Sequence, residues 1–275
     1  MDKKSFVNIF HLEDKNSISN LFDKLILASK TGHTIYCNEF YTPNIWKTLE
    51  EIEGELFVKV ISYGLFEDAE RKMIAFTSEE NEESLEFPVK VIFIKNKSKF
   101  KTLKHKDYLG AIMSLGIKRE KLGDVVLSGE GCYFPVCSDI SDYVFANLDT
   151  IGNNPCSFEV LNPSVDSIPT ANYEEKVIII SSLRMDCFIS SICNVSRAVA
   201  AEMIDNGKVL LDYIEVKSKE KKVSTKSVIT VRGYGKFKIG EEIGTTQKDR
   251  IRILVKKYIW FWGELHENDV YGYYE

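Results

Sequence analysis

Cysteine and histidine are sparse in this sequence, and neither is spaced for metal binding. The six cysteines, at positions 37, 132, 137, 156, 187 and 193, form no C-x-x-C pair, and the four histidines show no H-x-x-x-H spacing. A zinc site needs such clustered ligands, so no metal site and no cofactor are predicted. Free thiols in a reducing compartment are the simplest interpretation of these cysteines.

Long hydrophobic runs are also absent. The first 16 residues hold no apolar stretch of signal-peptide length, and runs such as Val177 to Ile180 are far too short to span a bilayer. The chain contains no P-loop, no G-x-S-x-G elbow and no H-E-x-x-H motif. We therefore expect a cytoplasmic protein with no membrane partner, and no small-molecule substrate is evident.

The charge is distributed unevenly along the chain. The net charge of -5 over 275 residues argues, as an average, against nucleic-acid binding. Residues 1–84, however, hold 9 basic and 16 acidic residues, whereas residues 176–258 hold 17 basic and 9 acidic residues. A second basic segment, residues 90–121, holds 10 basic residues against Asp107 and Glu120. These two segments are the candidates for binding phosphate.

Residues 1–84 are predicted to form an acidic α/β module. Apolar residues recur at helical spacing from Ile18 to Ile26 in a run that ends at Gly32, and Pro43 is expected to open a second helix. Alternating residues from Leu56 to Val60 and the run from Met73 to Phe76 predict two strands. A glutamate-rich linker follows.

Residues 85–175 are predicted to form a second module. Its pattern is strand, helix, strand, strand, helix, strand, beginning at Val89 to Ile94 and ending at Ser157 to Leu161. That is the ferredoxin-like order used by RNA-recognition domains among many others, so it is weak evidence of RNA binding by itself. Aromatic residues placed like those of the usual RNA-recognition strands are not evident.

The basic segment of this module strengthens the RNA hypothesis. Lys118, Arg119 and Lys121 follow the helix stop at Gly116, so they are expected on a loop, where phosphate contacts are readily made. The alternative is a solvated lysine-rich surface. An acid-base pair of His105 and Asp107 is disfavoured because the two residues do not share a helical face, and a capping role suits Asp107 better.

Residues 176–258 are predicted to form a third module, in which two helices follow a strand. Ser196 is expected to cap the second helix, which places Arg197 in its first turn. Exposed N–H groups beside an arginine form a site for an anion such as phosphate. Pairing of Arg197 with a carboxylate, Asp186 or Asp205, is the alternative.

Four short stretches of the third module carry a family resemblance. S-L-R-M-D at 182–186, N-V-S-R at 194–197, I-D-N-G-K-V at 204–209 and V-R-G-Y-G-K-F at 231–237 resemble the S-four RNA-binding domain. H-K-D-Y-L-G-A-I-M-S-L-G-I-K-R-E-K-L-G-D at 105–124 is similar to the signature of the YlmH family of bacterial proteins, which carry that domain at their C-terminus. Together the resemblances imply an α+β chain of three small modules with the ferredoxin-like one in the middle.

The resemblance implies a non-catalytic protein whose partners are rRNA and tRNA on the large ribosomal subunit. The family is associated with ribosome quality control on stalled subunits and has been linked to cell division. Nine residues match the RNA-facing parts of the S-four domain: Ser182, Arg184, Ser196, Arg197, Lys208, Arg232, Gly233, Gly235 and Lys236. In the second module, the candidate RNA-binding residues are His105 at the helix start and Lys118, Arg119 and Lys121 on the basic loop. Asp186 is expected to orient Arg184. Asp212, Ser227 and Lys236 depart from the family pattern, which puts fine RNA specificity in doubt.

Two other classes of function remain open from the residues alone. An RNA-modifying enzyme, a pseudouridine synthase or a methyltransferase, would need catalytic machinery ahead of the third module, and neither a G-R-L-D-like motif nor a convincing nucleotide loop is found there. A protein-interaction adaptor would use the acidic module. The tail, residues 259–275, begins with an apolar cluster that more often packs on its own domain than stays exposed.

Overall fold

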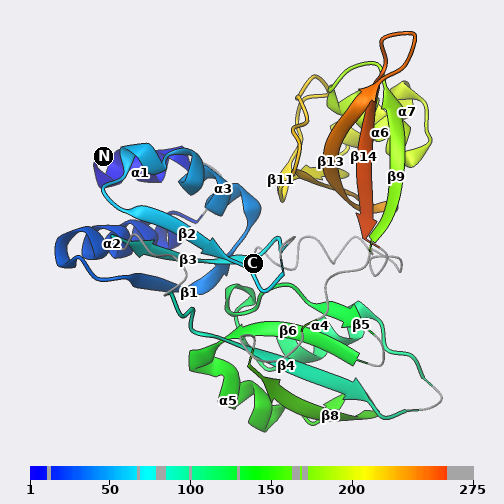
Figure 1. Ribbon diagram of the computed structural model, residues 1–275. Coiled ribbons are helices and arrows are strands. Elements are labelled where there is room, and N and C mark those ends of the chain that lie inside the picture. Colours follow the sequence, from blue (N-terminus) through cyan, green and yellow to red (C-terminus); the bar gives the residue numbers. More distant parts are fainter. Residues whose placement is uncertain are drawn as a thin grey trace. The chain divides into compact units, whose positions relative to one another are not determined.

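The structure is a computed structural model of the chain that describes residues 1–10, 14–66, 69–78, 85–98, 101–128, 131–162, 168 and 173–258 (Figure 1). The chain divides into two compact units, Met1–Ala171 and Asn172–Glu275. Both units combine helices with antiparallel sheet, which confirms the predicted α+β class. The predicted tail lies outside the described residues. The finer boundary predicted near residue 84 lies inside the first unit and stays a prediction.

The first unit begins with a three-stranded sheet and three helices. The strands β1 (Ile35–Tyr41), β3 (Lys72–Thr77) and β2 (Lys59–Tyr63) lie in the order β1-β3-β2, and all neighbours are antiparallel. The helices are α1 (Lys3–Ile9), α2 (Lys15–Thr31) and α3 (Pro43–Glu51), with a short 3-10 turn η1 (Glu53–Glu55) after α3. Gly32 ends α2 in the left-handed region at φ 70°, as its position in the sequence predicts.

The sequence prediction missed two elements of this part. The helix α1 was not predicted, although Asp2 caps it by accepting from the Ser5 N–H. The strand β1 was not predicted either, because its alternation breaks at Asn38, which adopts φ 51° at a shift in the pairing register. The module therefore has three strands, not two, and its middle strand in the sheet is β3.

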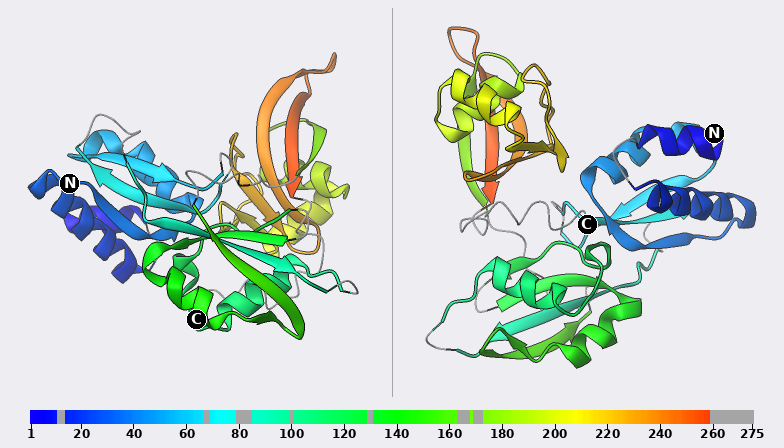
Figure 2. Two further views of the ribbon diagram at one scale, coloured as in Figure 1. Left: turned by 60° about the horizontal axis from the view of Figure 1, so that its bottom comes forward. Right: turned by 180° about the vertical axis from the view of Figure 1, so that it is seen from behind.

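The rest of the first unit is a five-stranded antiparallel sheet with two helices on one face (Figure 2). In chain order the elements are β4 (Val89–Asn96), α4 (His105–Met113), the 3-10 turn η3 (Arg119–Lys121), β5 (Val126–Ser128), β6 (Gly131–Cys137), α5 (Ser138–Asn147), β7 (Thr150–Ile151) and β8 (Asn154–Leu161). The sheet order β5-β6-β4-β8-β7 places β4 and β6 at the centre. The predicted ferredoxin-like order is observed, with the short β7 added at the edge.

The two parts of the first unit contact each other through a small set of buried groups. Asp124 accepts from the backbone N–H of Glu70 at 2.6 Å and of Arg71 at 3.2 Å. Phe40 of β1 packs in one apolar cluster with Cys137 of β6, and the Cys137 thiol donates to the Asn38 carbonyl at 3.2 Å. The contacts therefore join β1 and β3 to the ends of η3 and β6.

The second unit is a six-stranded antiparallel sheet with two helices packed against one face (Figure 1). Its elements are β9 (Tyr173–Ile180), α6 (Met185–Cys193), α7 (Arg197–Asp205), β10 (Val209–Leu211), β11 (Ile214–Glu215), β12 (Val228–Val231), β13 (Gly235–Thr245) and β14 (Ile251–Tyr258). The order is β11-β10-β12-β13-β14-β9. Phe188 of α6 and Val231 of β12 are fully buried in a core that the helices share with the sheet.

The α6–α7 corner is set by local sequence. Asn194 ends α6 in the left-handed region at φ 54°, and the Ser196 hydroxyl accepts from the Val199 N–H at 3.2 Å to cap α7. In the described part of the chain no single helix is long and apolar enough to cross a membrane; α6 and α7 reach that length only together, bent by 111°.

Candidate RNA interface

Arg184, Asp186 and Arg197 converge at the α6–α7 corner. Arg184 donates from Nε to Asp186 Oδ1 at 3.0 Å and from Nη2 to Oδ2 at 3.1 Å. Arg197 donates from Nη2 to the same Oδ2 at 2.7 Å. One carboxylate thus holds two guanidinium groups, which come from the residue before α6 and from the first turn of α7.

The carboxylate is buried, whereas both arginines remain partly open to solvent. The Asp186 side chain is 6% exposed, against 36% for Arg184 and 56% for Arg197. The hydrogen bond from Arg184, followed by that from Arg197, holds the pKa of Asp186 well below its usual range although burial opposes this. Asp186 therefore stays ionised and the arginines keep surface for a further anion.

Of the two carboxylates considered as partners for Arg197, Asp186 is the one in contact. The expectation that Asp186 orients Arg184 also agrees with the geometry. Glu220 adds a second, exposed carboxylate, which accepts from Arg184 Nη2 at 3.2 Å. An incoming phosphate would compete with Glu220 for Arg184, because both are acceptors of the same guanidinium.

A second group of predicted residues lies at the end of β12. The backbone N–H of Arg232 donates to the backbone carbonyl of Lys208 at 2.9 Å, so the backbones of these two basic residues are neighbours. Lys208 is exposed and Arg232 is half-buried. Gly233 is exposed at φ 82°, with open space where a side chain would stand, so the turn leaves its backbone accessible. Gly235 is buried, with the Lys257 side chain over it.

Lys236, which the sequence predicts to contact RNA, is buried in the second unit. It is only 6% exposed, and its ammonium group donates to the Tyr213 hydroxyl at 2.8 Å and lies 4.6 Å from the centroid of the Tyr213 ring. The ammonium group also lies 5.5 Å from the Tyr258 ring. The structure therefore assigns Lys236 to the packing of the sheet, because a buried cation needs such partners.

The basic loop of the middle domain is used mainly inside the protein. Arg119 donates to the carbonyls of Leu122 at 2.7 Å and Gly123 at 3.1 Å. Lys121 donates to the Asn38 carbonyl at 3.0 Å and pairs with Asp139 at 2.6 Å. Both side chains therefore already have hydrogen-bond partners within the protein. Lys121 also helps to join the two parts of the first unit.

The remaining predicted residues have simpler surroundings. Lys118 is exposed at the start of η3, and Ser182 lies at 3.4 Å from the Cys187 sulfur. His105 is half-buried in the first turn of α4. Asp107 caps the start of α4 by accepting from the Lys104 N–H at 2.8 Å, as expected. This contact places the Asp107 carboxylate at the helix start instead of in an acid-base pair.

Sequence reasoning missed an aromatic pair on the middle sheet. Phe93 of β4 and Tyr133 of β6 are direct cross-strand partners, and their rings stack with centroids 4.4 Å apart and 28° between planes. The signal in the sequence was the alternation of β4, in which Ile92 and Ile94 are fully buried and Phe93 points the other way. The expectation that no aromatic residues stand at such positions is corrected.

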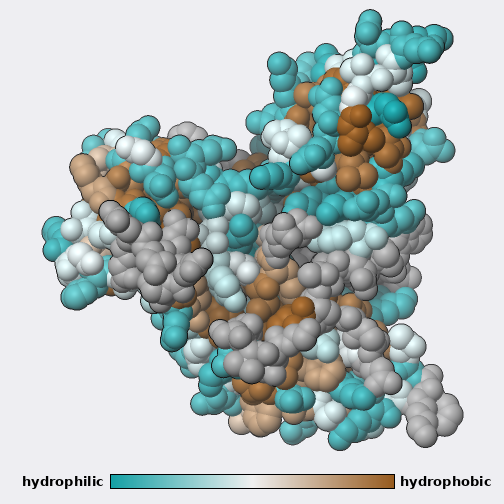
Figure 3. Space-filling model, in the orientation of Figure 1, coloured by the Kyte–Doolittle hydropathy of each residue, from teal (hydrophilic) through white to brown (hydrophobic). Residues whose placement is uncertain are grey.

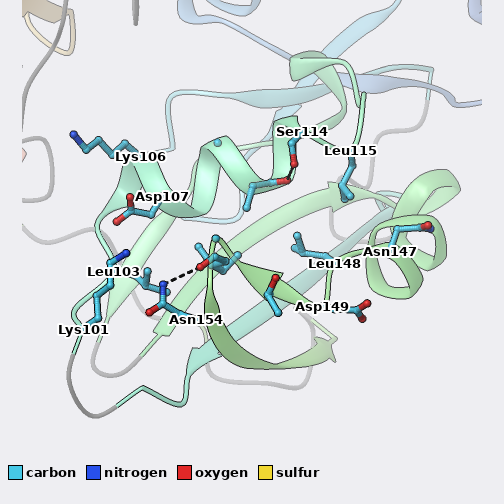
Figure 4. Close-up of a pocket in the computed structure, with 15 residues that line it drawn as sticks. Lys101, Leu103, Lys106, Asp107, Ser114, Leu115, Asn147, Leu148, Asp149 and Asn154 are labelled. Atoms are coloured by element: carbon cyan, nitrogen blue, oxygen red, sulfur yellow. Dashed lines mark hydrogen bonds between the residues drawn. The ribbon is translucent and has the colours of Figure 1, made fainter.

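The first unit also has a surface cavity of about 610 Å³ between α4 and the segment from Asn147 to Asn154 (Figure 4). Lys101, Lys106 and Asp149 are among the charged residues that line it. Asn154 donates to the Ile151 carbonyl at 2.9 Å, so this buried amide holds the β7–β8 turn. Across the described residues no cluster of His, Cys, Asp and Glu could hold a metal ion.

Comparison with known proteins identifies the middle domain. Residues 82–164 match the family described as "Putative RNA-binding domain in YlmH". The ribosome-associated protein quality control protein P2 of Bacillus subtilis (strain 168) is 29% identical over 220 residues, which cover 80% of this chain and 86% of that protein. The middle domain is thus similar to the RNA-binding domain of YlmH. The YlmH match contains the whole sheet from β4 to β8, including the Phe93–Tyr133 pair.

A solved structure named cell division protein ylmH from Streptococcus pneumoniae is also similar. It aligns with a TM-score of 0.45 and 21% sequence identity over 56% of this chain and 93% of the solved chain.

Proposed function

We propose that this chain belongs to the YlmH family and is a non-catalytic RNA-binding protein that acts with the ribosome in the quality control of stalled translation. The family match, to a domain described as RNA-binding, and the name of the Bacillus subtilis relative support this proposal. The partners we propose are structured rRNA and tRNA on the large subunit, in the cytoplasm. A link to cell division rests only on the family resemblance of the sequence.

The observation that carries the proposal is the arginine pair on Asp186. Two guanidinium groups held by one buried carboxylate form a cationic site whose geometry is set before RNA arrives. A site ordered in advance loses less side-chain entropy on binding. The resemblance of residues 176–258 to the S-four domain supports a role for the same corner, and we propose that Ser182, Ser196, Lys208, Arg232 and Gly233 contribute to it.

The binding mode we propose is electrostatic docking with recognition of shape. Structured RNA presents phosphates and 2′-hydroxyls across a shallow minor groove, which arginine, lysine and helix N-terminal N–H groups can contact without reading the sequence. Arg197 in the first turn of α7 and the exposed Lys208 supply such groups on one unit. The acidic first 84 residues are proposed to stay away from phosphate.

The test removes both arginines from the full chain. The double variant Arg184→Ala with Arg197→Ala should abolish co-sedimentation with ribosomes and weaken binding to a structured RNA hairpin. The slope of log binding constant against log salt concentration should become smaller in magnitude by about two. The matched control is Lys248→Ala with Arg250→Ala, which removes two exposed basic residues near the β13–β14 turn. Wild-type affinity that does not change with salt, or full ribosome binding by the Arg184/Arg197 variant, would overturn the assignment.

A further inference from the structure

The open face of the middle sheet carries a second, independent candidate for contact with RNA. The helices α4 and α5 pack on the opposite face, where Ile92, Ile94 and Phe134 are fully buried beneath them. Phe93 and Tyr133 alternate with those residues, so their rings lie on the face turned away from the helices, where both are half-buried beside the buried Val91 and Pro135. We propose that the Phe93–Tyr133 pair is a stacking site for the bases of single-stranded RNA.

The geometry of the pair favours stacking. A side chain on Gly131 would stand 2.2 Å from the Phe93 ring, so the glycine makes room for the ring to lie over the β6 backbone. The ring then stacks on Tyr133 with 28° between planes, and both side chains are half-buried. Adjacent rings on a rigid sheet form an apolar surface on which a planar base gains stacking energy with little loss of side-chain entropy.

The protein covers this face only in part. Val126 of β5, the cross-strand partner of Tyr133, is fully buried in a cluster with Phe66 and Ala69. These residues from the β2–β3 connection close the β5 side of the open face. Figure 3 shows hydrophobic residues at the surface of both units, including the part of the first unit that carries β4 and β6. The stacked pair therefore borders covered apolar residues without being buried by them.

Charge favours a nucleic acid as the occupant over an apolar protein segment. Lys95 follows Phe93 by two residues on the same face of β4, and the exposed Lys97 lies just past the end of the strand. On the other side, the cross-strand partner of Phe93 is the exposed Glu159 of β8. A strand stacked on the pair would thus direct its phosphates toward the lysines and away from the carboxylate.

The inference deepens the proposed function, since it also takes RNA as the ligand, but it uses a different surface and a different form of RNA. The Arg184–Arg197 corner is proposed for structured RNA, and the Phe93–Tyr133 pair for unpaired bases. The two proposals can therefore fail separately. A chain that binds a hairpin but no single strand keeps the first and loses the second.

The experiment measures binding of the full chain to a short single-stranded oligoribonucleotide containing 2-aminopurine. Phe93→Leu and Tyr133→Leu should each lower the affinity about tenfold or more, because each removes an aromatic surface while keeping an apolar side chain. Tyr133→Phe should bind like the wild type. The control is Phe145→Leu, since Phe145 is an aromatic residue 45% exposed on α5. Hairpin binding should be unchanged in all four variants.

A second measurement uses the unaltered protein, so it does not depend on how the variants fold. Ultraviolet crosslinking to the same oligoribonucleotide, followed by mass spectrometry, should place the crosslink on the peptides that carry Phe93 or Tyr133. Stacking should also quench 2-aminopurine fluorescence. Equal affinity of the leucine variants and the wild type, or crosslinks confined to residues 176–258, would overturn the stacking site and leave the proposed function in place.

Discussion

Arg197 donates to the buried carboxylate of Asp186 at 2.7 Å across the α6–α7 corner. Because Arg184 contacts the same carboxylate through two nitrogens, the three side chains behave as one unit. Asp186 carries the charge that repels phosphate, yet it also holds the two groups that attract it. The charge of Asp186 should therefore weaken RNA binding, whereas its positioning of the arginines should strengthen RNA binding. A substitution that removes the charge can show which effect is larger.

Replacing Asp186 by asparagine should weaken RNA binding. A neutral amide keeps the shape of the side chain but loses the charge-assisted hydrogen bonds, so both arginines gain freedom and the affinity for a hairpin RNA should fall about tenfold. Simple electrostatics predicts the reverse, since a negative charge is removed. Fluorescence anisotropy at a fixed salt concentration measures the change.

Glu220→Gln is the matched control for that variant. Glu220 is exposed and accepts from Arg184, so its neutralisation removes a competitor for phosphate while Asp186 still holds the arginine. Affinity should stay equal or rise. If Asp186→Asn and Glu220→Gln both raise the affinity, Asp186 has no positioning role.

The same carboxylate should make the stability of the second unit depend on pH. The pKa of Asp186 is lower in the folded state than the value of about 3.9 for an unfolded aspartate. Its stabilising contribution is therefore complete above about pH 5 and is lost as the pH falls. Urea unfolding should show a larger gap between wild type and Asp186→Asn at about pH 7 than at about pH 3. A gap that does not change with pH would contradict the lowered pKa.

Much of the fold could be predicted because its signals are local. The end of α2 at Gly32 and the cap of α7 at Ser196 each depend on a few neighbouring residues. The ferredoxin-like order of the middle domain also follows from alternation and helical spacing. In contrast, β1 was missed because Asn38 interrupts the alternation, and the place of β14 in its sheet depends on pairing with β9, which lies far away in the sequence.

The residues predicted from the sequence to contact RNA differ in their exposure. Arg184, Arg197 and Lys208 are basic and at least partly exposed. Lys236 and Lys121 are equally basic in the sequence, but only tertiary structure places one over a tyrosine ring and the other on a backbone carbonyl. Residue type alone cannot separate these cases, since lysine stems pack readily on apolar and aromatic neighbours.

Lys236→Ala should therefore destabilise the second unit without weakening RNA binding by the folded protein. The substitution leaves the Tyr213 hydroxyl without its donor and removes a buried aliphatic stem, at a cost of about 1–3 kcal/mol in the free energy of unfolding. Lys208→Ala, on an exposed residue, should show the opposite pattern: unchanged stability and weaker RNA binding. Urea unfolding and anisotropy on the same samples distinguish the two, and an RNA defect in folded Lys236→Ala would restore its predicted role.

The contact between the two parts of the first unit can be followed through Cys137. Burial raises the pKa of the Cys137 thiol to about 12, and also that of Cys37 to about 12, so neither should react with iodoacetamide in the native protein near neutral pH. Lys121→Ala removes the bond to Asn38 and the ion pair with Asp139. Loss of the Lys121 charge raises the pKa of Cys137 further, so faster alkylation of Cys137 can come only from exposure of the thiol as the contact opens. We expect that exposure to dominate, whereas Cys37, buried in the core of the first module, should remain protected. Mass spectrometry after a timed pulse gives both rates in one sample; equal acceleration at the two cysteines would mean that Lys121 stabilises the whole unit instead of this contact.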